Sequence, residues 1–236
     1  MILYKHCGAE GGLKCLDSEK IWLARPRSFN DPFDVLPHIE TRANRVKAKN
    51  GVEINTSDIV VLCLAERIDS PLMWAHYANS HSGLLIGFNR RGRIIEDGLL
   101  FRKFGAVSYS HYRPSAASFE DLSDDKIYFR KSSEWTYERE WRLVTSTVTD
   151  HGTKVDDDHW SFQMFPRDVV TIVVGHRGSS CFPKLYEILR RSQYEHVTLQ
   201  IAVPHPKNFE LIINEWPRDK WEDGKPPTPM VDTSFK

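Results

Sequence analysis

Short apolar runs recur along the chain, and most have the length and composition of buried β-strands. The clearest are residues 58–66, DIVVLCLAE, and residues 168–175, DVVTIVVG, where β-branched and apolar side chains lie between polar ends. Weaker runs of the same kind predict further strands at residues 2–7, 21–24, 83–88, 105–110, 160–165, 197–204 and 209–214.

Helical patterns are fewer than strand patterns. In residues 70–83, SPLMWAHYANSHSG, Ser70 is a good N-cap, Pro71 suits the first helical position, and Gly83 can end the segment. The side chains that would share one face of this helix are Met73, Trp74, Tyr77 and His81.

Two further helices are expected, and together these elements define the fold class. The first covers residues 116–132, with Phe119, Leu122, Ile127 and Tyr128 inward, and the second is amphipathic and begins near Pro183. Strands do not alternate regularly with helices, so a doubly wound parallel sheet is disfavoured. We expect a single α+β domain over residues 1–216, with mixed or antiparallel sheets, about three helices and a central cleft. Residues 217–236 are polar and Pro-rich, which is typical of a tail or a docked extension.

Composition narrows the classes of partner and compartment. The chain has 236 residues, of which 40% are hydrophobic, and its 32 basic residues balance its 32 acidic residues. No overall field therefore attracts nucleic acid or an anionic membrane. No apolar run approaches the roughly 20 residues that cross a bilayer, and the N-terminus lacks a secretory signal, so we expect a cytoplasmic protein with no membrane partner. The scattered cysteines indicate neither a zinc site nor a disulfide framework, and we expect no metal.

The densest chemistry lies in residues 135–144, WTYEREWRLV. Taken as a strand, this segment places large apolar side chains on one face and the charged side chains of Glu138, Glu140 and Arg142 on the other. Two carboxylates so close raise each other's pKa, and a neighbouring arginine lowers both. The segment is either a solvated sheet face with an internal ion pair or part of an active site.

A second candidate is the turn in residues 28–33, SFNDPF. Asn30 and Asp31 can bond to nearby backbone and fix the turn, while Phe29 and Phe33 can hold it against the core. The turn is either purely structural or a rigid loop that holds Asn30 or Asp31 over a pocket.

The histidines give weaker signals. His76 and His81 are five residues apart, which is not the spacing of a zinc-protease helix, and Tyr4 and His6 share one face of the first strand. Phosphate-loop, dinucleotide-binding and nucleophile-elbow motifs are missing from the sequence.

Several of these stretches resemble one family in their order. The segments LYKH, IWLARPRSFNDPFD, LCLAE, LMWAHYANSHSGLLIGF and KSSEWTYEREWRL are similar to the domain-of-unknown-function-2971 family of bacterial proteins, from about Leu3 to at least Gly175. The elements that carry the resemblance are FNDPF, MWxHYxxxHxG and ExEWR.

The family also looks like a distant relative of ADP-ribosyltransferase-like folds, which bind NAD between two small sheets. That resemblance implies a histidine on the first strand, a serine element in the middle and a late Glu-x-Glu, which correspond here to His6, to Ser110 within residues 108–110, and to the pair Glu138 and Glu140. The first-strand arginine that some of these enzymes use is missing, and the middle element is not a clear match.

The resemblance implies roles for the remaining candidates. Glu140 would stabilise the ribose cation, Glu138 would orient the acceptor, and Arg142 would hold ribose or phosphate oxygens. The side chains expected to bind NAD are Tyr4, His6, Asn30, Asp31, Trp74, Tyr77 and Ser110.

Three functions remain open at this point. The first is an NAD-consuming transferase or glycohydrolase, as a toxin or in defence, whose acceptor is an unknown protein or nucleic acid. The second is a metal-dependent nuclease with Asp31, Glu138 and Glu140 around magnesium, which would need a nearby lysine or third acid. The third is a non-enzymatic interaction module. The sequence does not define the oligomeric state.

Overall fold

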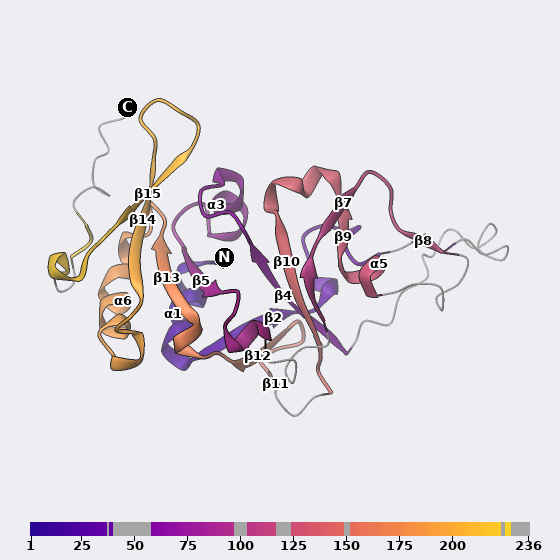
Figure 1. Cartoon of the computed structure of the whole chain (residues 1–236), viewed down its shortest axis with the longest axis horizontal. Helices are drawn as coiled ribbons and strands as arrows, with labels where there is room; N and C mark the ends of the chain where they lie inside the picture. Colours follow the sequence, from indigo (N-terminus) through magenta and orange to yellow (C-terminus); the bar gives the residue numbers. More distant parts are fainter. Residues whose placement is uncertain are drawn as a thin grey trace. The chain divides into compact units, whose positions relative to one another are not determined.

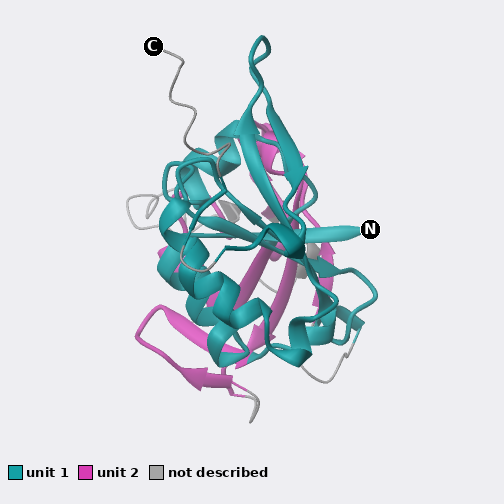
Figure 2. Ribbon diagram, turned by 90° about the vertical axis from the view of Figure 1, so that its left-hand side faces the viewer, with its two compact units in different colours: residues 1–21, 64–97, 163–236 teal, residues 22–63, 98–162 magenta. Residues whose placement is uncertain are grey.

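The computed structural model describes residues 1–36, 38–39, 58–96, 103–116, 124–148, 152–222 and 225–227. The chain forms two compact units, coloured separately in Figure 2. Unit 1 comprises residues 1–21, 64–97 and 163–236, and unit 2 comprises residues 22–63 and 98–162.

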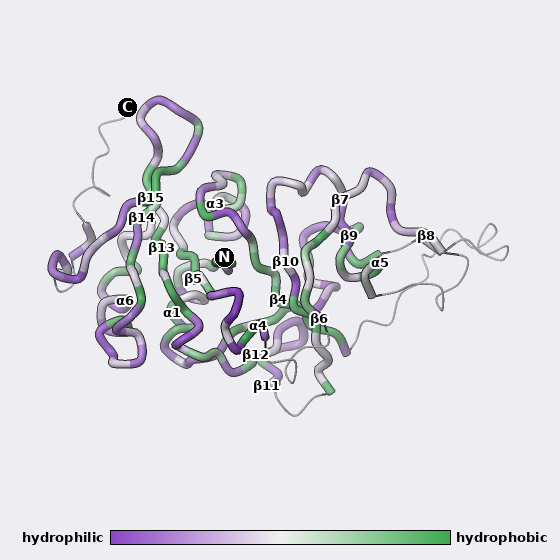
Figure 3. Tube along the Cα trace, viewed as in Figure 1, coloured by the Kyte–Doolittle hydropathy of each residue, from purple (hydrophilic) through white to green (hydrophobic). Residues whose placement is uncertain are grey.

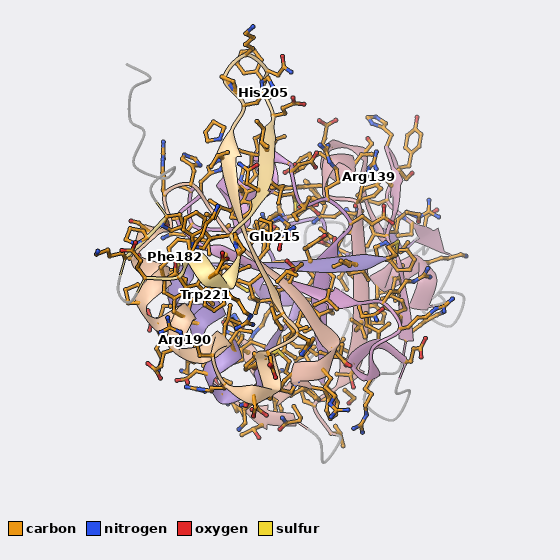
Figure 4. All side chains as sticks on the ribbon, turned by 60° about the vertical axis from the view of Figure 1, so that its left-hand side comes forward. Arg139, Phe182, Arg190, His205, Glu215 and Trp221 are labelled. Carbon is orange, nitrogen blue, oxygen red and sulfur yellow. The ribbon has the colours of Figure 1, made fainter. Side chains whose placement is uncertain are left out.

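Unit 1 is built on a mostly antiparallel sheet, seen in Figure 1. β5 (Leu84–Asn89) pairs antiparallel with β1 (Ile2–Cys7) and with β13 (Val169–Val174). β13 pairs parallel with β14 (Thr198–Pro204), which forms an antiparallel hairpin with β15 (Leu211–Glu215). Helix α6 (Phe182–Leu189) connects the two parallel strands, since such strands need a crossover. Figure 4 labels His205 and Glu215 at the two ends of the hairpin.

The other helices of unit 1 are short. They are α1 (Ala9–Ser18), α3 (Pro71–Tyr77) and α4 (Arg93–Glu96). The predicted start of α3 is confirmed, because Pro71 is its first residue and Ser70 Oγ accepts a hydrogen bond from Met73 N at 3.5 Å. The predicted end at Gly83 is wrong: the helix stops at Tyr77, and residues 79–81 adopt left-handed backbone conformations that a helix cannot continue through. His81 therefore lies beyond the helix rather than on its face.

One hydrophobic cluster in the core of unit 1 gathers around Trp74. The buried residues of this cluster are Trp74, Ala78, Leu85, Val173, Ala202 and Leu211. β5 and β13, which supply Leu85 and Val173, are drawn largely in the hydrophobic colour in Figure 3. Near-continuous apolar runs in β5 and β13 reflect burial of both faces of these strands. This is the physical reason that their positions could be predicted from the sequence.

The segment after β15 docks on α6. Trp221 stacks on Tyr186 with ring centroids 5.0 Å apart, and Figure 4 places it near Phe182 and Arg190. Arg218, in the 3₁₀ helix Arg218–Lys220, donates to the carbonyl oxygens of Leu189, Tyr194 and Val197. The first residues of the predicted Pro-rich tail thus form a docked extension.

Unit 2 consists of shorter strand pairs. Ala24 of β2 (Lys20–Ala24) pairs with Val61 of β4 (Ile59–Ala65). β6 (Lys103–Ala106) pairs antiparallel with β10 (Glu140–Ser146), and β11 (Gly152–Lys154) pairs antiparallel with β12 (His159–Gln163). β10 also pairs with β4, and β12 also pairs with β2. The parallel pairs are β7 (Ser108–Ser110) with β9 (Arg130–Ser132) and β3 (His38–Ile39) with β8 (Ser115–Ala116). Short 3₁₀ helices cover Pro26–Ser28 and Ser133–Glu138.

Two predicted elements of this unit differ in the structure. The strand expected at residues 105–110 is divided at Val107, whose N–H donates to the carbonyl oxygen of Glu140 instead of continuing one ladder. The helix expected at residues 116–132 is wrong at its end, because α5 covers only Asp124–Tyr128 and is followed by β9. Phe119 and Leu122 lie outside the described residues.

The predicted α+β class is confirmed. Sheets are mixed and mostly antiparallel, and three described helices, α1, α3 and α6, have seven or more residues. Within the described ranges, no helix is both long enough and apolar enough to cross a membrane.

Candidate functional site

Only the second half of residues 135–144, the segment with the densest chemistry in the sequence, forms a strand. Ser133–Glu138 forms a 3₁₀ helix, η2, because Ser132 Oγ accepts the backbone N–H of Glu134 at 3.4 Å and caps its start. Arg139 then adopts a left-handed conformation with φ of 45°, and β10 begins at Glu140. The strand predicted over residues 135–139 is therefore wrong, and a turn at Arg139 brings Glu138 beside the strand. Figure 4 labels Arg139.

The charged side chains of this segment are buried. Glu138, Glu140 and Arg142 have exposed fractions of 2%, 5% and 0%. The interpretation of this segment as a solvated sheet face is wrong, because these three side chains are buried. Charges that are buried in this way must be paired and hydrogen-bonded to persist.

Arg142 is the centre of the cluster. Its Nη1 and Nη2 donate to Asp34 Oδ1 and Oδ2 at 2.8 and 2.6 Å, and its Nε and Nη2 donate to Glu140 Oε1 and Oε2 at 2.8 and 2.9 Å. Nη1 also donates to the carbonyl oxygen of Tyr128 at 2.8 Å. The guanidinium of Arg142 thus holds two carboxylates in fixed positions. Its planar shape suits such two-pronged pairing with carboxylates.

Lys131, on β9, forms the second cationic centre. Its Nζ lies 2.7 Å from Glu138 Oε2, and 3.5 Å from both Asp34 Oδ2 and Glu140 Oε2. Its side chain is 4% exposed. We call Asp34, Lys131, Glu138, Glu140 and Arg142 the acid–base cluster.

Ion pairing keeps Glu140, Lys131 and Arg142 charged. Burial alone would raise the pKa of Glu140, but the charge and hydrogen bonds of Arg142, together with the charge of Lys131, lower this pKa to about 2. Burial would likewise lower the pKa of Lys131, yet the charges of Glu140, Glu138 and Asp34 raise it above its usual value. The pKa of Arg142 is raised by Glu140 and Asp34 against the effect of burial. Glu140, Lys131 and Arg142 are therefore ionised at neutral pH.

Aromatic rings surround the charges. Arg142 lies over the Phe29 ring, with Cζ 5.4 Å from its centroid, and Lys131 Nζ lies 4.8 Å from the Trp135 ring centroid. Tyr109 Oη accepts the backbone N–H of Glu140 at 2.8 Å. Burial is the main cause that raises the pKa of Tyr109, so its hydroxyl stays protonated.

The FNDPF turn forms as predicted, except at one aromatic residue. Asp31 Oδ1 accepts the backbone N–H of Phe33 at 2.9 Å, which confirms the Asx turn, and Phe29 packs against the core of unit 2. Phe33 is 59% exposed, so the prediction that it holds the turn against the core is wrong. Asn30 is exposed, and Ser110 Oγ accepts the backbone N–H of Tyr112 at 3.1 Å.

The remaining predicted residues belong to unit 1. The His6 and Trp74 rings meet edge to face at 6.0 Å, and burial, followed by the charge of Lys5, lowers the pKa of His6 to about 3. Trp74 is fully buried, and its Nε1 donates to Ile68 O at 2.7 Å, so it is a core residue. Tyr4 packs against the same core, and the Tyr77 ring lies 6.0 Å from that of His76. The proposed cleft draws on residues of both units and stays a prediction.

The sequence did not reveal Asp34 or Lys131. Asp34 ends the quoted segment IWLARPRSFNDPFD, but Asp31 is equally buried, and only the hydrogen bonds of the folded structure identify Asp34 as the partner of Arg142. Lys131 carries no local signal. Among the described residues, no group of three or more His, Cys, Asp or Glu side chains has an arrangement that could hold a metal ion.

Residues 73–143 match the family described as "Protein of unknown function (DUF2971)". This confirms the resemblance to that family, over the part of the chain that contains Trp74, His81 and the acid–base cluster except Asp34. No curated protein and no solved structure matches the chain.

Proposed function

We propose that the chain is an NAD-consuming enzyme, a transferase or glycohydrolase, with the acid–base cluster as its catalytic centre. The supporting observation is that Glu138 and Glu140 are buried carboxylates in fixed positions, with Glu140 held ionised by Arg142 and Lys131. Cleavage of the nicotinamide–ribose bond develops positive charge on the sugar. Fixed negative charge in a water-poor site stabilises such a transition state without reorganisation.

The composition of the cluster supports a cationic rather than an anionic reacting centre. Its three carboxylates, Asp34, Glu138 and Glu140, outnumber its two cations, Lys131 and Arg142, so these five side chains carry a formal charge of 3 − 2, or one negative charge. The rings of Phe29 and Trp135 lie against Arg142 and Lys131 and keep these two cations in place beside the carboxylates. In this proposal Glu140 faces the ribose and Glu138 orients the acceptor.

Nicotinamide release tests the proposal. The purified chain is incubated with NAD, and free nicotinamide is measured by mass spectrometry for wild type, Glu138→Gln and Glu134→Gln. Glu134 lies in the same 3₁₀ helix as Glu138 but is exposed, so it is the matched control. We expect release by wild type and Glu134→Gln and a loss of at least 100-fold in Glu138→Gln. Absence of release by wild type, or equal release by all three, contradicts the proposal.

A second candidate is the metal-dependent nuclease, because the cluster contains the lysine and the third acid that such chemistry needs, Lys131 and Asp34. In the observed arrangement these carboxylates bind Lys131 and Arg142, so a magnesium ion would have to displace a cation. Magnesium-dependent cleavage of DNA or RNA that is lost in Glu138→Gln would favour this candidate. We propose the cytoplasm, where NAD is available, as the compartment of the activity.

A further inference from the structure

Two loops of unit 1 meet at the carboxyl end of β13. The N–H of Gly175 donates to Gly83 O at 3.0 Å, and the N–H of Arg177 donates to His81 O at 3.1 Å. β13 runs parallel to β14, so the carboxyl ends of these two strands lie at the same edge of the sheet. These loops carry two histidines and an arginine that the proposed catalytic centre does not use.

The backbone around His81 is held in an unfavourable conformation. Asn79, Ser80 and His81 have φ values of 46°, 52° and 68°, and each such residue costs about 1–2 kcal/mol. Backbone hydrogen bonds hold the loop, from His81 N to Trp74 O at 3.2 Å and from Gly83 N to Ala78 O at 2.8 Å. Strain that is held so firmly is typical of functional sites, and here its result is the placement of the His81 ring.

The two imidazoles lie side by side with buried, unpartnered nitrogens. The His81 and His176 ring centroids are 5.0 Å apart, and His81 stacks on Trp74 at 6.4 Å with 6° between the planes. The Nδ1 atoms of both histidines are buried and make no hydrogen bond. A buried polar atom without a partner costs about 1–3 kcal/mol. Both Nδ1 atoms are closed to solvent in this structure, so a ligand that recovers this free energy must enter between the two loops.

The electrostatics of the site favour an anion. Arg177 is exposed, and its positive charge acts on both rings. Burial first, and then the charge of Arg177, lower the pKa of His81. Burial, His81 and Arg177 together lower the pKa of His176 to about 4. The positive charge of Arg177 beside the two rings disfavours a metal cation and favours a ligand with negative charge.

We propose that His81, His176 and Arg177 form a binding site for a phosphoryl group, either free phosphate or the phosphate of a nucleotide. The imidazole Nδ1–H groups donate to phosphate oxygens, and the Arg177 guanidinium supplies the opposite charge. The proposal does not depend on the acid–base cluster, because all of its residues lie in unit 1.

The experiment measures binding of inorganic phosphate and of AMP to the full chain by calorimetry. The variants are His176→Phe, which keeps a ring, and Arg177→Gln, which changes an exposed residue; Arg91→Gln, also exposed in unit 1, is the matched control. We expect at least tenfold weaker binding for the first two and unchanged binding for the control. Tighter binding of AMP than of phosphate identifies a nucleotide as the ligand, and equal binding identifies the phosphoryl group alone.

Two further readouts keep the proposal falsifiable. Titration of the imidazole ¹⁵N resonances should show the pKa values of His81 and His176 rising when phosphate is bound. Glu138→Gln should bind phosphate like wild type, so failure of the catalytic proposal is distinguishable from failure of this one. Wild-type affinity in Arg177→Gln, no binding to wild type, or binding of zinc in place of phosphate overturns the proposal.

Discussion

Arg142 and Asp34, 108 residues apart in the chain, share a two-pronged ion pair with N–O distances of 2.8 and 2.6 Å. This pair ties the FNDPF turn to β10, and neither side chain has an exposed fraction above 8%. A buried pair adds little net stability compared with a well-packed apolar pair, but breaking it leaves an uncompensated charge in the interior. Single substitutions in the acid–base cluster are therefore expected to change the free energy of unfolding strongly.

Replacing Arg142 tests this expectation. In Arg142→Met, Asp34 and Glu140 lose their main cationic partner while remaining buried, so we expect the free energy of unfolding to fall by about 3–5 kcal/mol. Urea denaturation monitored by circular dichroism gives this value. Arg139→Met, three residues away and exposed, should change stability by about 0.5 kcal/mol or less. Equal effects of the two substitutions would contradict the buried network.

The pH dependence of stability should report on Glu140. Its folded-state pKa, about 2, lies below the usual 4.5, so its carboxylate stabilises the fold above pH 4.5 and this contribution is lost as pH falls toward 2. The shift corresponds to a contribution on the order of 3 kcal/mol. The stability difference between wild type and Glu140→Gln should therefore shrink across that window. A difference for Glu140→Gln that stays constant as pH falls from 4.5 toward 2 would show that the carboxylate is not held ionised.

The strands and the helix starts were predictable because local composition decides them. The apolar run at residues 168–175 and the sequence Ser70-Pro71 carry their structural signal within a few residues. The strand predicted over residues 135–144 is confirmed from Glu140 onward and wrong before it, because alternation alone does not exclude a capped 3₁₀ helix. Ser132 caps the 3₁₀ helix and Arg139 ends it in a left-handed conformation, and the alternation of side chains indicates neither feature.

The candidate site was predictable only in part. The spacing of Glu138, Glu140 and Arg142 indicated a charged group, but not its burial or its partners. Asp34 and Lys131 join it through tertiary packing over sequence distances that local patterns do not encode. The sequence analysis missed the pair His81 and His176 for the same reason. The two histidines are 95 residues apart in the sequence, and only the folded chain brings their loops together.

The substitution Trp74→Phe tests whether the indole of Trp74 stabilises the core of unit 1. The indole N–H donates to Ile68 O at 2.7 Å within a fully buried site, so phenylalanine leaves a carbonyl without its donor and a small cavity. We expect a loss of about 2–3 kcal/mol in the free energy of unfolding. Thermal or urea unfolding measures it. Leu72→Ala, on the same helix but half exposed, is the control and should cost well under half as much. A loss below 0.5 kcal/mol for Trp74→Phe would mean that the indole is not a core anchor.

Glycine substitutions test the contact between the two loops at the phosphoryl site. A Cβ at Gly175 would lie 2.1 Å from His81 O, a backbone atom that cannot move without breaking the bond from Arg177 N. Gly175→Ala should therefore lower the free energy of unfolding by more than about 3 kcal/mol, or else separate the loops and abolish phosphate binding. Gly11→Ala is a control of opposite sign, because a Cβ there meets nothing within 4 Å and Gly11 lies inside α1. Alanine at that position should stabilise the protein by about 0.5–1 kcal/mol. If Gly175→Ala kept wild-type stability and wild-type phosphate affinity, the close approach of the loops at His81 would be wrong.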